Sequence, residues 1–210
     1  MSSLANSNGL DDKLLQLSAA MDAFEGYAPG QASRVAWAAD ALAEKFGIAH
    51  RDREFLQHAA SLHDIGEVRM NRDYLRANRA LSISERLDLE RHPIIGEQES
   101  AKHDLPKSVQ LLIRWHHEWW NGDGYPDRLQ AEQIPLSARI LRVADAYCSL
   151  TAERPWRAAM ADGEARQQLV LGAGHEFDPS IVYAFSEIQL PAAAEANTAA
   201  DAGIFSSFGR

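Results

Sequence analysis

The 210-residue sequence has a single cysteine, Cys148, so no disulfide can form within the chain. Basic residues are also scarce: 21 Lys and Arg stand against 30 Asp and Glu, which leaves a formal net charge of −9. This balance argues against a nucleic acid polymer or an anionic membrane as a partner, because both attract clustered cationic side chains. An anionic ligand would therefore need local positive charge from metal ions or from a few arginines.

Long apolar runs are missing as well. No stretch approaches the roughly 20 apolar residues of a membrane-spanning helix, and the polar start MSSLANSNGL contains no signal region. We expect a cytoplasmic protein that does not bind membranes, which agrees with the sparse use of cysteine. With 46% hydrophobic residues, a chain of this length can form one well-buried core.

Alternating strand patterns are absent, and helical periodicity takes their place along nearly the whole chain. We predict an all-α protein folded as a compact multi-helix bundle. A capping box at Ser82 to Glu85 and a terminating Gly47 mark helix ends, and Pro93 predicts a kink or a boundary. The predicted helices cover residues 11–24, 31–46, 51–64, 82–102, 106–120, 135–150, 163–171 and 178–188.

The predicted elements divide the chain into three parts. We expect an N-terminal helix or extension at residues 1–26, a helical domain at 27–190 and a mobile, alanine-rich tail at 191–210. No internal repeat is evident in the sequence.

Four of the predicted helices carry side chains that bind metals near one end. Imidazoles and carboxylates without a thiolate suit iron, manganese, zinc or nickel, and an aspartate can bridge two such ions. Paired ions polarise a phosphoryl group, so phosphoester hydrolysis is the reaction class indicated. Each residue alone also fits an ordinary role at a helix end or in the core, and only their conjunction points to a site. The candidates are His63, Asp64, His92, His116, His117 and Asp145.

Two motifs, LHDIG at residues 62–66 and HHEWWNGDGYP at 116–126, resemble those of the HD-GYP domain, a branch of the HD phosphohydrolases. HPIIG at 92–96, IPLSARILRVADAY at 134–147 and ERPWR at 153–157 extend the resemblance in the order that the family shows. It implies a helical bundle of the HD-domain type with two or three metal ions. It also implies hydrolysis of the bacterial second messenger cyclic di-GMP to pGpG or GMP.

The resemblance implies roles for the matching positions in this sequence. The metal ligands would be His63, Asp64, His92, His116, His117 and Asp145, with Asp64 bridging and with His63, Asp64 and Asp145 as the catalytic set. The substrate side would be shaped by Gly122, Gly124, Tyr125 and Pro126, with Arg154 and Arg157 placed to meet phosphate. Trp119 and Trp120 could stack on guanine, but we favour a place in the wall of the core.

Four positions depart from the family pattern. Gln31 stands where a histidine is usual, and a neutral amide is a poor transition-metal ligand. Tyr27 replaces the glutamate of the three-metal branch, and Cys148 replaces a second aspartate. Glu67 replaces a lysine and repels phosphate, unless it becomes a ligand itself. We therefore expect one firmly held divalent ion and a second, weaker site.

Two functions stay open on this evidence. One is a phosphodiesterase for cyclic di-GMP, with its activity impaired by the changes at Gln31 and Glu67. The other is a degenerate module that binds the nucleotide or a partner protein without hydrolysis. A homodimer or a signalling protein as partner is compatible with both. An HD hydrolase for another nucleotide is disfavoured, because DGYP and IPLSARI go beyond the general HD pattern.

Overall fold

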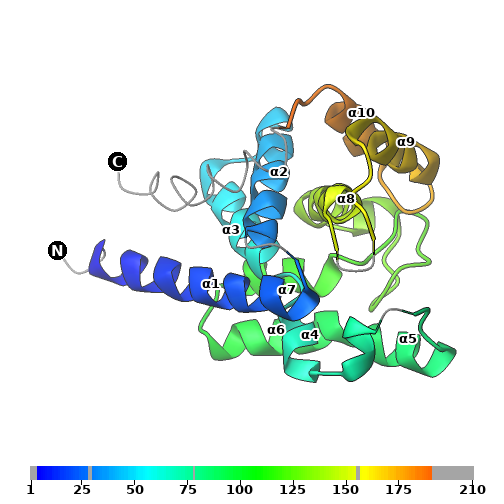
Figure 1. Ribbon diagram of the computed structural model, residues 1–210. Helices are drawn as coiled ribbons and strands as arrows, with labels where there is room; N and C mark the ends of the chain where they lie inside the picture. The colour runs from blue at the N-terminus through cyan, green and yellow to red at the C-terminus, as the bar shows by residue number, and fades with distance from the viewer. Residues whose placement is uncertain (1–3, 28–29, 78, 155–156, 191–210) are drawn as a thin grey trace.

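The computed structural model describes residues 4–27, 30–77, 79–154 and 157–190, and within these ranges the chain forms helices and no strand (Figure 1). The elements are α1 (Leu4–Glu25), α2 (Gln31–Lys45), α3 (His50–Leu62), α4 (Ile65–Met70), η1 (Asp73–Arg76), α5 (Ile83–Leu89), α6 (His92–Lys102), α7 (Lys107–Trp115), η2 (Ala131–Gln133), α8 (Leu136–Thr151), α9 (Asp162–Gly172) and α10 (Pro179–Ser186). The predicted all-α class is confirmed. The predicted tail at 191–210 lies outside the described residues.

Helix α8 lies at the centre of the upper half of the molecule. Figure 1 shows it end-on between α2 and the α9–α10 pair, and it also contacts α3 and α7. Its apolar stripe forms the core with residues of the neighbouring helices, and each such side chain stabilises the fold by about 1.5–3 kcal/mol. Residues with no exposed surface include Leu42, Leu56, Ile113, Ile140 and Leu141. This packing fixes the direction of α8 and therefore the position of Asp145.

A second group contains α4, α6 and α7, with α6 packed against the other two, and α4 and α6 lie below α1 in the view of Figure 1. The close approach of α4 to α6 depends on Gly66, because a Cβ there would lie 2.0 Å from the carbonyl oxygen of His92. No side chain fits at that distance from backbone. Gly66 thus allows the start of α4 to lie directly against the start of α6, which brings Asp64 beside His92.

The predicted helix boundary at the HD pair is wrong. The helix predicted at 51–64 ends at Leu62, and Asp64 precedes a separate short helix, α4, that was not predicted. The kink or boundary predicted at Pro93 is a boundary: residues 82–102 contain two helices, α5 and α6, because Pro93 lacks an amide hydrogen and fits in the first turn of α6. The capping box between Ser82 and Glu85 is confirmed, with the Glu85 amide donating to Ser82 Oγ at 3.3 Å.

Two further helices differ in length from the prediction. Helix α1 begins at Leu4 rather than at residue 11. Helix α7 ends at Trp115 rather than at residue 120, because the following amides have partners that are distant in the sequence. The Trp120 amide donates to the Glu176 carbonyl at 3.1 Å, and the Asn121 amide donates to the His175 carbonyl at 2.9 Å. These tertiary hydrogen bonds replace the bonds that a longer helix would make.

Over the part of the chain that the structure describes, no helix combines the length and the apolar character needed to cross a bilayer. The division into an extension at 1–26 and a domain at 27–190 stays a prediction. Helix α1 contacts α2, α3 and α4.

Gly66→Ala should lower the free energy of unfolding by about 1–3 kcal/mol, because the added methyl group forces α4 away from the His92 carbonyl. Urea denaturation measures the change. Gly163→Ala is the matched control, since a Cβ at Gly163 in α9 meets nothing within 4 Å. Equal stability of the Gly66→Ala protein and the unsubstituted protein would contradict this account of the α4–α6 contact.

Candidate metal centre

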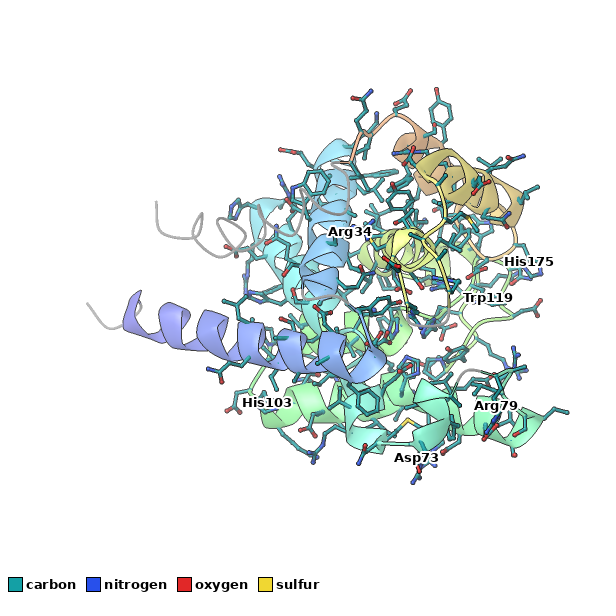
Figure 2. The ribbon with its side chains drawn as sticks, in the orientation of Figure 1. Arg34, Asp73, Arg79, His103, Trp119 and His175 are labelled. Carbon is teal, nitrogen blue, oxygen red and sulfur yellow. The ribbon has the colours of Figure 1, made fainter. Side chains whose placement is uncertain are left out.

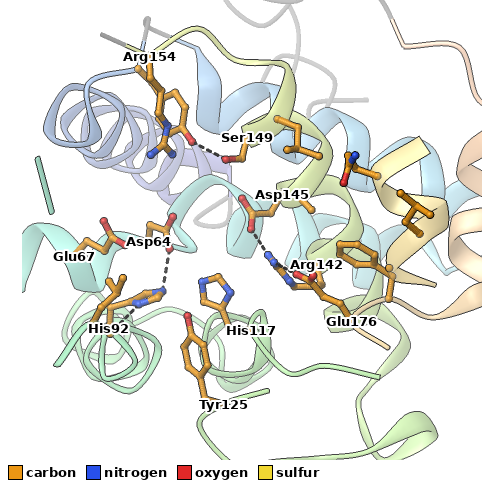
Figure 3. A pocket seen from close by; sticks show the side chains of 18 residues that line it. Asp64, Glu67, His92, His117, Tyr125, Arg142, Asp145, Ser149, Arg154 and Glu176 are labelled. Carbon is orange, nitrogen blue, oxygen red and sulfur yellow. Dashed lines mark hydrogen bonds and ion pairs between the residues drawn. The ribbon is translucent and has the colours of Figure 1, made fainter. Parts of the chain in front are cut away.

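Four of the predicted ligands converge on one point. Asp64, His92, His116 and His117 each offer one ligand atom, and these four atoms all lie within 4.8 Å of one another. Asp64 lies at the α3–α4 junction, His92 is the first residue of α6, and the two adjacent histidines directly follow α7. Figure 3 shows Asp64, His92 and His117 facing the same space. Residues far apart in the sequence therefore meet where helix ends come together.

The orientation of three buried imidazoles follows one rule. The Nδ1 atoms of His63, His92 and His116 lie 2.8, 2.8 and 2.6 Å from the backbone carbonyl of the residue three positions earlier. A carbonyl oxygen can only accept, so each Nδ1 carries the hydrogen. In the neutral ring, the lone pair is then on Nε2, which points into the site. Such backbone contacts are the usual way in which a metal-binding histidine is oriented.

These inward lone pairs repel one another. Nε2 of His92 and Nε2 of His116 are 3.3 Å apart, and they lie 3.1 and 3.3 Å from Oδ1 of Asp64. Neutral imidazoles with hydrogen on Nδ1 cannot donate to one another or to the carboxylate through Nε2. Protons, a water molecule that donates hydrogen bonds, or a cation would relieve the repulsion. One carboxylate oxygen and three imidazole nitrogens fit a divalent transition metal.

The pKa shifts differ among the four candidate ligands. Burial lowers the pKa of His117 well below its ordinary value, and the neighbouring His116 lowers it further. Burial also lowers the pKa of His116. For Asp64, burial acts to raise the pKa, but the charge of His63 and the hydrogen bonds that protonated histidines donate outweigh it and hold the pKa well below its usual range. For His92, burial acts to lower the pKa, but the hydrogen bond to Asp64 and the charge of Asp64 outweigh it and raise the pKa. The shifts thus favour neutral His116 and His117 beside an ionised Asp64, with His92 more basic than either.

A second set of ligands adjoins the first through the other oxygen of Asp64. His63 Nε2 lies 3.1 Å from Oδ2 of Asp64 and 3.4 Å from Oδ1 of Asp145. Burial opposes a charge on His63, yet these two carboxylates raise its pKa well above the ordinary value. Asp64 therefore faces the first cluster with Oδ1 and His63 with Oδ2. A bridging carboxylate has this disposition.

Gln31 and Glu67, two of the positions that depart from the family pattern, differ in where their side chains point. Gln31 is buried at the start of α2, where its Oε1 accepts a hydrogen bond from Nη1 of Arg34 at 3.2 Å, and it does not line the cavity described below. Glu67 does line that cavity. Burial, followed by the nearby Asp64, raises the pKa of Glu67 to about 7. Glu67 is therefore partly protonated near neutral pH and repels phosphate less than an ionised carboxylate would.

One acidic residue near the site, Glu25, is not among the candidates that the sequence patterns predicted. Glu25, at the end of α1, is 9% exposed, and burial together with Asp64 and Glu67 raises its pKa well above the ordinary value. Its carboxylate lies 3.9 Å from Nη2 of Arg154. No motif spacing marks Glu25, because its place beside the site depends on how α1 packs on α4.

The metal cluster opens into a cavity of about 590 Å³. Tyr125 lines this cavity, and its ring stacks on His117 with the ring centroids 4.9 Å apart. Among the described residues of the same loop, Gly122, Gly124 and Pro126 do not line it. Gly124 has a different role, since a Cβ there would lie 2.2 Å from the Trp119 nitrogen and 2.5 Å from the His117 oxygen. Gly124 thus allows the loop to pack against the backbone of the ligand pair.

The predicted cationic residues are divided between the cavity and the surface. Arg154 lines the cavity, with its guanidinium carbon 4.0 Å from the centroid of the Tyr27 ring. Arg157 is exposed, donates to the Ser149 carbonyl and is not part of the described lining. Arg142, which the sequence reading missed, lines the cavity from α8. Its spacing of three residues from Asp145 placed both on one helix face and was the available signal.

The two tryptophans lie away from the cavity. Trp119 packs beside His175, with ring centroids 5.5 Å apart, as Figure 2 shows at the edge of the molecule. The Trp120 ring lies under the Arg139 guanidinium at 5.5 Å. Neither tryptophan is among the described residues that line the cavity, which favours a place in the wall of the core over stacking on guanine.

Comparison with known proteins identifies the family. The profile of the HD domain matches residues 18–181. The chain belongs to the HD domain family. Curated relatives also support the HD-GYP resemblance. A cyclic di-GMP phosphodiesterase of Vibrio cholerae is 38% identical over 65% of this chain and 29% of its own length. The cyclic di-GMP phosphodiesterase response regulator RpfG of Xanthomonas campestris is 31% identical over 85% of this chain and 49% of its own length.

Other relatives and solved structures extend the comparison. A 3'3'-cGAMP-specific phosphodiesterase of Vibrio cholerae is 32% identical over 71% of this chain and 29% of its own length. The crystal structure of a cyclic GMP-AMP specific phosphodiesterase of V. cholerae has a TM-score of 0.68 at 20% identity, over 85% of this chain and 48% of that one. The likeness to this structure shows a shared fold. The chain spans less than half the length of the three curated relatives.

His116→Ala should weaken Mn²⁺ binding at least about tenfold, because it removes an inward Nε2 from the cluster of four ligands. Equilibrium dialysis followed by elemental analysis gives the affinity. His50→Ala is the control, since the His50 side chain is 76% exposed at the far end of α3. Unchanged Mn²⁺ affinity in a folded His116→Ala protein would exclude this cluster as the metal site.

Proposed function

We propose that this chain is a metal-dependent phosphodiesterase that hydrolyses cyclic di-GMP to pGpG or GMP. The observation that supports it best is the set of inward imidazole lone pairs around Asp64 at the end of a cavity of about 590 Å³. A cavity of this size is in the range that holds a small organic ligand. The relatives named as cyclic di-GMP phosphodiesterases support the choice of substrate.

Two divalent ions are proposed, and their ligands differ in number. Asp64, His92, His116 and His117 would hold the first. His63, Asp64 and Asp145 would hold the second more weakly, because Gln31 is bonded to Arg34 and brings no imidazole. Iron, manganese, zinc and nickel all suit such ligands. When bound, the ions supply Lewis-acid polarisation of the phosphoryl group and make water more acidic.

The chain's own residues provide position and charge. The Tyr125 ring, stacked on His117, is proposed to hold that imidazole in place. Arg154 carries positive charge on the cavity wall and is proposed to meet phosphate. We propose that Gly122, Gly124 and Pro126 support the loop and do not contact the substrate. We also propose that Arg157 does not contact the substrate directly.

The alternative, a module that binds nucleotide without cleavage, is favoured only by the changes at Gln31 and Glu67. The relatives extend well beyond the matched region, so their whole activities and partners are not carried over. A homodimer or a signalling protein as partner stays a prediction.

Asp64→Asn should reduce cyclic di-GMP hydrolysis at least about 100-fold, because the bridging charge is lost. Product formation is followed by chromatography with anaerobically purified, Mn²⁺- or Fe²⁺-loaded protein, and cyclic GMP-AMP serves as the comparison substrate. His50→Ala should retain full turnover. Persistent hydrolysis by folded Asp64→Asn protein would exclude the mechanism. Nucleotide binding without turnover by the metal-loaded, unsubstituted protein would support the alternative.

Gln31→His should increase the bound metal from about one ion per chain towards two, since an imidazole would replace a poor ligand at the position where the family pattern has a histidine. Elemental analysis after dialysis measures the ratio, and the rate of hydrolysis should rise with it. Gln98→His adds a histidine to an exposed position of α6 as control. A constant metal ratio in the Gln31→His protein would mean that Gln31 is too far from the second site to supply a ligand.

A further inference from the structure

The cavity is lined by an arginine, Arg142, that has no role among the proposed metal ligands. Among the described residues that line it, Arg142 and Arg154 are the two arginines, and no lysine is present. The Arg142 side chain is only 14% exposed, although an arginine is costly to bury without a function or a partner. Figure 3 shows its guanidinium beside Asp145 and Glu176, on the side of Asp64 and His117 opposite to Glu67.

The contacts of Arg142 leave one edge of the guanidinium incompletely used. Nη1 donates to Oδ2 of Asp145 at 2.8 Å, which leaves Oδ1 of Asp145 facing His63. Nη2 donates to Oε1 of Glu176. Nε is buried and has no acceptor among the described residues. A phosphate typically binds an arginine through two parallel bonds, and the Nε–Nη2 edge can make both, whereas Glu176 accepts through Nη2 alone.

The backbone of Glu176 has hydrogen bonds of its own, in addition to the contact of its side chain with Arg142. It lies in the loop between α9 and α10, where its carbonyl accepts the Trp120 amide at 3.1 Å. Its side chain is 24% exposed and lines the cavity. The carboxylate can therefore leave Arg142 without displacing the loop.

We propose that Arg142 is a phosphate-binding residue of this cavity, and that the Glu176 carboxylate occupies its anion position in the free protein. The inference rests on the proposed function, because the ligand is one phosphodiester of a cyclic dinucleotide. Such a ligand carries two phosphodiesters. While one is at the metal centre, the other needs a cation elsewhere in the cavity. Arg142 also provides positive charge in a chain where position 67 carries a carboxylate.

Binding of a bis-phosphorothioate analogue of cyclic di-GMP to Mn²⁺-loaded protein tests the proposal by calorimetry, since this probe resists hydrolysis. Arg142→Ala should raise the Kd at least about tenfold through loss of charge-assisted hydrogen bonds. Glu176→Gln should lower the Kd about threefold to tenfold, because the competing negative charge is removed. Opposite effects from two residues that contact each other are not expected from a purely structural ion pair.

The controls separate phosphate binding from other effects. Arg51→Ala removes one positive charge from an exposed position about 18 Å from His63 along α3, and should leave the Kd unchanged. Metal content is measured for every variant, because Arg142 also contacts Asp145. If circular dichroism shows that Arg142→Ala does not fold, the test uses Arg142→Lys and Glu176→Gln instead. Glu176→Gln is useful here because the described contacts of Glu176 do not include Asp145, a proposed metal ligand.

The outcomes distinguish this inference from the proposed hydrolysis. Weaker binding by Glu176→Gln, an unchanged Kd for folded Arg142→Ala or no binding by the unsubstituted protein would each overturn it. Binding that shifts as expected in a protein without turnover would support the Arg142 assignment and reject hydrolysis. Turnover of cyclic di-GMP without these shifts in Kd would support hydrolysis and reject the assignment.

Discussion

The arrangement of the helices depends on the buried negative charge of Asp64. A carboxylate is costly to bury unless charges or hydrogen bonds compensate it. Asp64 has partners on both oxygens, with His92 and His116 on Oδ1 and His63 on Oδ2. The partners come from the end of α3, the start of α6 and the end of α7. One charge therefore links three places in the chain that share no local periodicity.

Close backbone packing makes this meeting possible. Gly66 lets α4 lie against the His92 carbonyl, and Gly124 lets the following loop lie against the carbonyl of His117. The glycines of both motifs thus act on the positions of ligands rather than as ligands or substrate contacts. The carbonyls that orient the Nδ1 atoms belong to the same helix ends, so the backbone also sets the direction of each imidazole.

The cavity resolves the conflict between an acidic chain and an anionic ligand. Its carboxylates, Asp64, Glu67, Asp145 and Glu176, outnumber its two arginines. Metal ions would neutralise the acidic side, and Arg142 and Arg154 provide cationic groups at other points of the wall. Positive charge is thereby concentrated where a phosphate can reach it, although the net charge of the chain is −9. Such local focusing does not require a basic protein.

The sequence by itself determined the helical class, the extents of α2 and α8, the capping box at Ser82 and the candidate ligands that the structure brings together around Asp64. These features depend on local periodicity and on residue chemistry, which the sequence displays directly. Only the tertiary structure decided that α7 ends at Trp115, that Glu67 faces the cavity and that Arg142 contacts Glu176. The reason is physical: each of these outcomes depends on a hydrogen bond or a packing contact with a segment that is distant in the sequence, and neither helical period nor motif spacing encodes such a partner.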